Sequence, residues 1–126
     1  ILDAGYPTWL ISYWSVKKKV FSMEETIRRL TSDTANAAGL SDRGVLKTGL
    51  KADVNIIDWK NVGSSDPFMT QDLPAGGKRL MQTTQGYVAT IVSGKITYQN
   101  GVSTKERPGG LVRSVKDSQK IFAYTS

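Results

Sequence analysis

The sequence of 126 residues predicts an α+β fold, with helices in its first 40 residues and antiparallel strands after them. Helix-capping residues followed by apolar residues at helical spacing occur in residues 1–40. Beyond this segment, glycine turns separate short runs of β-branched residues, and the clearest runs form a meander over residues 87–104. The order of these signals therefore predicts helices first and an antiparallel sheet second.

The first helix is predicted to begin near Pro7, because proline suits the first turn, where its missing N–H would be unpaired anyway. An apolar stripe follows and ends at lysines 17–19; it consists of Trp9, Leu10, Tyr13 and Trp14. An aromatic stripe is compatible with a cofactor or sugar site, but packing in a core is its expected use here.

The second helix is predicted to begin at Ser22, in a capping box with Glu25 reaching back to the start of the helix. Its buried stripe is predicted to consist of Met23, Ile27 and Leu30. A short third helix, capped by Asp33 or Thr34, is predicted to end at Gly39 in the C′ position. The capping role accounts for Asp33 without any role in binding a ligand.

Residues 52–59 form a near-continuous apolar run, which predicts a strand buried on both faces. Residues 61–77 are predicted to form a loop, since Pro67 cannot donate a hydrogen bond to a regular ladder. A short strand is expected at 80–84. In the meander, the two-residue turns are predicted at Ser93-Gly94 and Asn100-Gly101, and residues 107–113 are expected to form a loop with an edge segment.

The chain has no cysteine and no histidine. Disulfides, a thiolate nucleophile and zinc-finger sites are therefore excluded, and the commonest metal ligand and general base are missing. An autonomous hydrolase is accordingly disfavoured. No apolar run is long enough to span a bilayer, so we expect no membrane partner and a cytoplasmic location.

The net charge is +6, from 17 basic and 11 acidic residues. The charges are dispersed apart from lysines 17–19 and the basic residues after Lys105, which we interpret as a solvated helix end and a solvated tail. No nucleic-acid partner is therefore expected. The alternative interpretation is an autonomous small binding module whose basic surface recognises an anionic partner.

Five segments share their residues and their order with one enzyme family. They are Asp-Ala-Gly-Tyr-Pro-Thr-Trp-Leu at 3–10, Leu-Thr-Ser-Asp-Thr-Ala at 30–35, the stretch 39–59 with Asp-Arg-Gly-Val-Leu and Gly-Leu-Lys-Ala-Asp-Val-Asn-Ile-Ile-Asp, Asp-Leu-Pro-Ala-Gly-Gly-Lys-Arg at 72–79, and Pro-Gly-Gly-Leu-Val-Arg at 108–113. This set resembles the N-acyl-D-amino-acid deacylase (D-aminoacylase-like) branch of the amidohydrolase superfamily. Beyond Ser114 the resemblance ends.

The resemblance implies that the chain is a C-terminal fragment of a bacterial enzyme with a (β/α)₈ barrel and a small β-sandwich. Residues 1–40 would be the terminal helical segment of the barrel, 41–114 the C-terminal part of an incomplete sandwich, and 115–126 a tail of uncertain structure. The parent enzyme would use zinc to activate a water that hydrolyses the amide bond of N-acyl-D-amino acids. The fragment itself would hold no cofactor, and its partner would be the remainder of the parent chain.

No catalytic or metal-binding residue is nominated, and the substrate-binding residues are left open. Asp3 begins a segment that bears a superficial likeness to the family's catalytic Asp-Gly-Gly-Ala-His pattern. The residues from Tyr6 onward, however, match family sequence that lies after that pattern, so a solvent-facing or helix-capping carboxylate is preferred for Asp3. Without the rest of the sandwich, we expect an unpaired sheet edge that favours self-association, and an aromatic stripe without its barrel partner.

Overall fold

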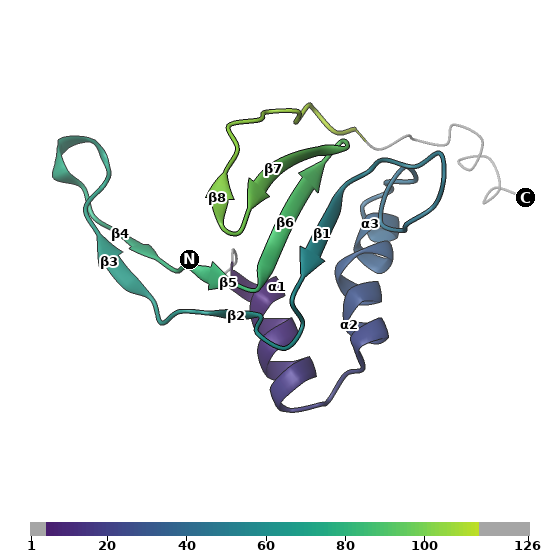
Figure 1. The fold of residues 1–126 in the computed structure, drawn as a ribbon, viewed down its shortest axis with the longest axis horizontal. Coiled ribbons are helices and arrows are strands. Elements are labelled where there is room, and N and C mark those ends of the chain that lie inside the picture. Colours follow the sequence, from purple (N-terminus) through teal and green to yellow (C-terminus); the bar gives the residue numbers. More distant parts are fainter. Residues whose placement is uncertain (1–4, 114–126) are drawn as a thin grey trace, which may run out of the picture.

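A computed structural model describes residues 5–113, which form helices followed by antiparallel strands. The predicted α+β fold is therefore confirmed (Figure 1). Asp3 and the tail at 115–126 lie outside the described residues. In the described part of the chain, no helix has the length and apolar character needed to cross a membrane.

The first helix consists of α1, Tyr6–Trp9, and the π-helix η2, Leu10–Lys17. Pro7 lies in its first turn, as predicted. The turns then widen, and the Lys18 N–H donates to the carbonyl oxygen of Tyr13, five residues earlier, at 2.8 Å. The buried side chains of this helix are Thr8, Ile11 and Ser15.

The aromatic stripe of this helix faces outward, since the side chains of Trp9 and Trp14 are 53% and 40% exposed. The predicted use of the stripe in a core is therefore wrong within this chain. Its rings pack on one another instead: Trp9 stacks on Tyr13 with centroids 4.4 Å apart, and Tyr13 meets Trp14 edge to face at 5.2 Å.

The second helix is α2, Met23–Leu30, and Ser22 caps it by accepting a hydrogen bond from the Glu25 N–H at 3.1 Å. The reciprocal half of the capping box is not formed, because the Glu25 carboxylate accepts from Arg29 at 2.8 Å. The predicted buried stripe is also wrong: Met23 and Ile27 are exposed. Thr26 is fully buried instead. Its hydroxyl is not left without a partner there, because it donates a hydrogen bond to the Ser22 carbonyl oxygen at 2.8 Å.

The third helix is α3, Ser32–Ala37, and its N-cap is Thr31, which makes no side-chain capping bond. Neither Asp33 nor Thr34 is the cap; Asp33 lies in the first turn and pairs with Arg28 at 3.4 Å. Gly39 ends the helix as predicted, with a φ of 69°. A Schellman motif closes there, since the Leu40 N–H donates to the carbonyl oxygen of Ala35 at 2.8 Å.

The principal sheet has the strand order β1-β6-β7-β8, and every neighbouring pair is antiparallel. The strands are Val54–Ile57, Tyr87–Val92, Lys95–Gln99 and Val102–Ser103. The turns at Ser93-Gly94 and Asn100-Gly101 have positive φ at both residues, so the predicted meander is confirmed. β1 is not buried on both faces, because Asn55 and Ile56 are exposed.

Between β1 and β6 the chain forms one long, interrupted hairpin. Its pairings are nested: Val54 with Ile91 in β1–β6, Ser64 with Thr84 in β2–β5, and Thr70 with Arg79 in β3–β4. The strands involved are β2 (Gly63–Ser64), β3 (Phe68–Thr70), β4 (Arg79–Met81) and β5 (Thr84–Gln85), and the 3₁₀ turn η3 (Pro74–Gly76) lies at the tip.

The loop predicted at 61–77 is therefore wrong in part, since it contains β2 and β3. Pro67 is accommodated because it stands between these two strands, where no ladder bond is required. We call the outer end of the hairpin, residues 66–82, the arm. Figure 1 shows the arm projecting from the sheet on the side away from α2 and α3.

Few apolar side chains are buried in the described residues. The apolar residues that are buried are Ile11, Ala35, Val62 and Ala89. The strand order places the described residues in one four-stranded sheet and two two-stranded ribbons. The assignment of the helices to a barrel and of the strands to a sandwich therefore stays a prediction.

Candidate functional site

Residues 5–113 contain no group of three or more histidine, cysteine, aspartate or glutamate side chains that could hold a metal ion. The candidates for a functional site in these residues are therefore single carboxylates and exposed surfaces. No catalytic residue was predicted from the sequence. Asp3, whose segment has a superficial likeness to the family's catalytic pattern, lies outside the described residues.

Arg43 is the centre of the most connected ionic cluster. Its guanidinium contacts Asp42 at 2.9 Å and Asp53 at 3.0 Å, and its side chain is 20% exposed. The second oxygen of Asp53 accepts a hydrogen bond from the Ser93 N–H at 2.8 Å. The cluster thus ties the loop after α3 to β1 and to the β6–β7 turn, which is a structural role.

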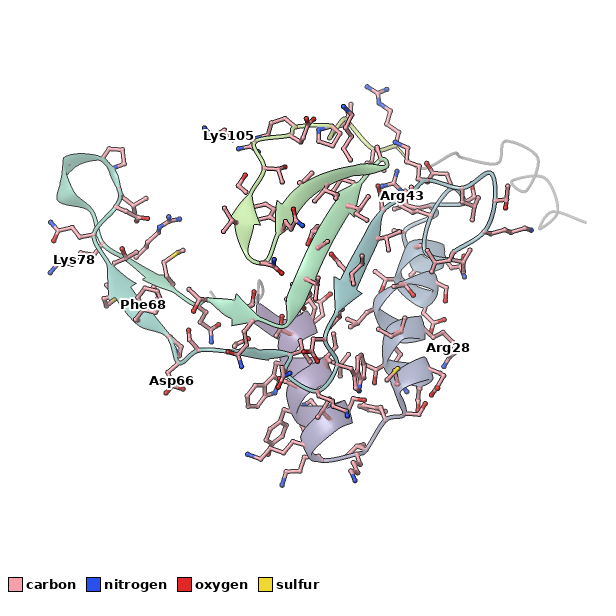
Figure 2. All side chains as sticks on the ribbon, viewed as in Figure 1. Arg28, Arg43, Asp66, Phe68, Lys78 and Lys105 are labelled. Atoms are coloured by element: carbon pink, nitrogen blue, oxygen red, sulfur yellow. The ribbon has the colours of Figure 1, made fainter. Side chains whose placement is uncertain are left out.

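The sequence points to the pair of Asp42 and Arg43, which are neighbours, but not to Asp53. This third member could not be found from spacing, because Asp53 is brought to Arg43 by an irregular loop, which the Lys51 N–H closes by donating to the Asp42 carbonyl oxygen at 2.9 Å. Figure 2 shows Arg43 near the upper end of β1, far from Phe68 and Lys78 on the arm.

The carboxylates with a resolved shift in the strand region are all held in their charged form. The Arg43 guanidinium beside Asp42 lowers the pKa of that carboxyl, and the Arg79 guanidinium does the same to the pKa of Asp72. The Asn61 amide lowers the pKa of Asp58 in the same way. A general acid at neutral pH needs the opposite shift, so these groups do not suit acid–base catalysis.

The arm has its own fixed tip. Arg79 reaches back to Asp72 with two hydrogen bonds, Nε to Oδ1 at 2.7 Å and Nη2 to Oδ2 at 2.6 Å. Ala75 adopts a left-handed conformation at φ 57°, which is strained for a non-glycine residue. Residues 72–79 therefore form a turn that this ion pair holds closed.

Exposed apolar side chains are the dominant surface feature of the described chain. They occur on the first helix, on the arm and on the four-stranded sheet. On the arm they are Phe68 at 44%, Met69 at 59%, Leu73 at 41% and Leu80 at 46% exposed. On the sheet they are Ile56, Val88, Ile96, Tyr98 and Val102. Exposed apolar side chains that are grouped in this way are typical of surfaces that another polypeptide covers.

Both edges of the four-stranded sheet are also open within residues 5–113. No strand pairs with the outer side of β1 or of β8 there. Open edges present unpaired N–H and C=O groups that accept a further strand. The candidate functional site of the described residues is therefore the exposed apolar surface together with these two open strand edges.

Most of the described chain matches a known protein family. Residues 7–98 match the amidohydrolase family. This chain belongs to that family. The amidohydrolase match covers the three helices, the arm and the sheet up to β7.

Curated relatives of this amidohydrolase chain carry two different names. A dihydroorotase of Lactobacillus acidophilus is 34% identical over 96 residues, and one of Bacillus cereus is 39% identical over 89 residues. An N-acyl-D-aspartate deacylase of Alcaligenes xylosoxydans xylosoxydans is 29% identical over 93 residues.

The two dihydroorotase matches cover 68% and 67% of this chain and 20% of each relative. The N-acyl-D-aspartate deacylase match covers 74% of this chain and 17% of the relative. The chain thus spans about a fifth of the length of the curated amidohydrolases that it matches. No solved structure has significant similarity to it.

Proposed function

We propose that this chain is the C-terminal structural portion of a metal-dependent amidohydrolase that hydrolyses the amide bond of N-acyl-D-amino acids. The observation that carries the proposal is the combination of a family match over residues 7–98 with a surface in which large apolar side chains stay exposed. An amidohydrolase segment with few buried apolar residues needs the rest of an enzyme to cover it.

In this proposal, residues 1–40 supply the terminal helices of the catalytic barrel and residues 41–114 supply strands of a small β-sandwich. The open edges of β1 and β8 favour the second assignment, because further strands can pair there. The outward-facing rings of Trp9 and Trp14 favour the first, because a barrel would cover them.

Zinc is the metal that we propose for the parent enzyme, bound outside this chain. Histidine and cysteine, its most frequent nitrogen and sulfur ligands, are absent here. The contribution of this chain would be to pack against the catalytic barrel and to hold its last helices in place. The chain alone is accordingly expected to be inactive.

The deacylase branch is supported by the N-acyl-D-aspartate deacylase match, which covers 74% of this chain. A second candidate, a dihydroorotase, is favoured by the higher identities of 34% and 39% to proteins of that name. The segments at 3–10, 30–35, 72–79 and 108–113 resemble the deacylase branch, so the deacylase is the function that we put first.

The test compares this chain with a chain extended upstream through the reading frame that precedes Ile1. We expect the extended protein to bind zinc and to deacetylate N-acetyl-D-amino acids, and the short chain to be metal-free and inert. Metal content by mass spectrometry and amine release measure the two properties.

Each alternative has its own outcome in this comparison. Stoichiometric zinc or turnover in the short chain would refute its structural role. Conversion of dihydroorotate, without deacetylation, by the extended chain would replace the deacylase with the second candidate and leave the structural role intact.

A further inference from the structure

The turn that joins β7 to β8 contains a reactive pair of residues, Asn100 and Gly101. A backbone nitrogen can attack the side-chain amide of the asparagine before it, and a side chain on the attacking residue hinders this reaction. Glycine has no side chain, so it offers the least hindrance. The chain has four asparagines, and Asn100 is the only one that a glycine follows.

The other three asparagines are followed by alanine, isoleucine and valine, of which the last two are β-branched. Asn36 lies in helix α3, and Asn55 lies in β1. The Asn61 side-chain amide donates a hydrogen bond to Asp58 at 2.7 Å. Ring closure requires the backbone to rotate, which a helix or a strand ladder opposes until it opens. We therefore expect these three residues to react slowly.

The Asn100-Gly101 turn, in contrast, is open to solvent. Both residues are exposed, and a Cβ added at Gly101 would have no atom within 4 Å, so there is free space around the turn. In residues 5–113, the Gly101 N–H donates no hydrogen bond, whereas the Asn100 N–H donates to the Val88 carbonyl oxygen at 2.9 Å. The attacking nitrogen is therefore not occupied by an acceptor in this part of the chain.

The folded turn alone opposes ring closure, because its tight geometry holds Asn100 at a φ of 49° and Gly101 at 79°. The reaction therefore needs the turn to open. β8 is two residues long and lies at the outer edge of the sheet (Figure 1). Its Val102 is 69% exposed. A short edge ladder with few buried side chains opens at a low free energy.

Thr104 limits this opening to the turn and β8. Its N–H donates to the Thr97 carbonyl oxygen at 3.0 Å, and its hydroxyl donates to the Ile96 carbonyl oxygen at 2.6 Å. Thr104 follows β8 directly, on the side away from the turn. The turn can thus open while the chain beyond β8 stays attached to β7.

We propose that Asn100 is a site of spontaneous modification, at which the side-chain amide is converted to a carboxylate. The Gly101 nitrogen forms a bond to Asn100 Cγ, and the bond from Cγ to the amide nitrogen breaks. Ammonia leaves with the proton of the Gly101 N–H, and a succinimide ring remains. Water then opens the ring at either carbonyl, which gives aspartate or isoaspartate at position 100.

Isoaspartate changes the edge of the sheet, because its main chain runs through Cβ and Cγ and is therefore longer. A two-residue turn does not accommodate the added length, so β8 loses its register with β7. Both products also add a negative charge, so they separate from the original chain by ion exchange. The modification goes beyond the proposed function and does not depend on it.

The test incubates the whole chain at mildly alkaline pH, without and with urea, and follows each asparagine by peptide mass spectrometry. Conversion is detected as the mass gain from replacing NH₂ by OH, and methylation by a protein isoaspartate methyltransferase measures the isoaspartate. In the folded chain, Asn100 is expected to convert at least about tenfold faster than the other three asparagines. Unfolding in urea should accelerate Asn100 by less than about tenfold, because the turn opens readily.

Two variants test the role of the turn. Asn100→Gly removes the reactive amide and retains a residue that adopts positive φ, so the fast conversion should disappear while the chain stays folded. Thr104→Val removes the hydroxyl that holds the chain after β8, so conversion of Asn100 in the folded chain should rise about threefold. Thr70→Val, a change of the same kind on β3 of the arm, is the control and should leave the rate unchanged.

Conversion of Asn100 in the folded chain at the rate of the other asparagines would overturn the proposal. An acceleration of more than about tenfold in urea would also overturn it, because the folded turn would then protect Asn100. An equal response to Thr104→Val and Thr70→Val would refute the opening of β8 as the route to the reaction.

Discussion

Gly86 is the residue at which the backbone tolerates least change. It joins β5 to β6 with a φ of 84°, and its carbonyl oxygen accepts a hydrogen bond from the Asp58 N–H at 2.7 Å. A Cβ at this position would lie 2.5 Å from the Cα of Val62. The two sides of the hairpin can therefore approach each other this closely only because residue 86 is a glycine.

Gly86→Ala is accordingly expected to destabilise the fold by about 3 kcal/mol or more, from both the clash and the positive φ. Gly94→Ala is the control, because Gly94 has a similar φ of 78° but no atom within 4 Å of an added Cβ. It should cost about 1 to 2 kcal/mol. Urea denaturation of both variants measures the difference, and equal losses would contradict the clash.

Single residues were the most predictable level of the structure. Ser22, Gly39 and the Asn100-Gly101 turn have the expected roles, because capping and turn preferences depend on neighbouring backbone alone. The burial of Thr26 and the exposure of Ile27 were not predicted, because they depend on contacts between elements and not on the neighbouring backbone. Which face of α2 is buried depends on what packs against it, and that contact is made with η2, about ten residues away in sequence.

At the scale of elements, the arm behaves as a separate unit. Its strands β3 and β4 pair with each other, while their pairing with the remaining strands is absent among residues 5–113. Its order therefore depends on this short ladder and on the fork between Asp72 and Arg79. An isolated two-stranded hairpin is at best marginally stable, so the fork matters.

The arm is consequently expected to loosen in acid. Arg79 lowers the pKa of Asp72 in the folded arm, so the folded form binds its proton less readily than the unfolded form. The stabilisation is present above the ordinary aspartate pKa, about 3.9, and is lost as the pH falls below it. The hydrogen-exchange protection factors of the β3–β4 amides, which are corrected for the pH dependence of the intrinsic exchange rate, should fall in this range.

Asp72→Asn is the control for this pH dependence. The amides of its arm should have lower protection factors at neutral pH, and these should change little on acidification, because the titrating carboxyl has been removed. Retention of the full acid response in this variant would show that another group is responsible.

The arm is also the element that the sequence did not predict. Residues 61–77 are rich in proline, glycine and polar residues, which is typical of a loop. The short strands β2 and β3 of this segment are strands only because each pairs with a strand from the other side of the tip, β5 and β4 respectively. Local patterns contain no information on such distant pairing, whereas the meander is held by turns of two residues and was predicted.

At the scale of the whole molecule, the open edge of β1 is expected to favour self-association. Ile56 is 49% exposed on this strand, and the outer side of β1 is unpaired within the described residues. The isolated chain is therefore expected to form dimers or larger species at high concentration. Sedimentation velocity over a range of concentrations measures this.

Ile56→Lys should shift the chain toward the monomer, because an edge lysine opposes pairing of like strands. Leu46→Lys is the matched control: Leu46 is 85% exposed but lies in the loop before β1, so this change should leave association unaltered. If both variants behave alike, the general gain of charge and not the strand edge accounts for the effect.

The sparse core was foreseeable only in part. The sequence predicted that an aromatic stripe and a sheet edge lack partners, but it also placed residues 52–59 in a buried strand. Apolar residues such as Ile56 have the composition of a core, and sequence patterns do not reveal whether the covering layer is in the same chain.

The nested pairings of the long hairpin also determine how the sheet can assemble. Val54 and Ile91 are far apart in sequence, but closing the tip at Asp72–Arg79 brings β3 onto β4, and each later pair then closes only a small additional loop. The pairing of Val54 with Ile91, a contact of high sequence separation, is thus expected to form last in this order. A defect at the tip of the arm would delay β1 and β6 at the other end of the ribbon, without touching either strand.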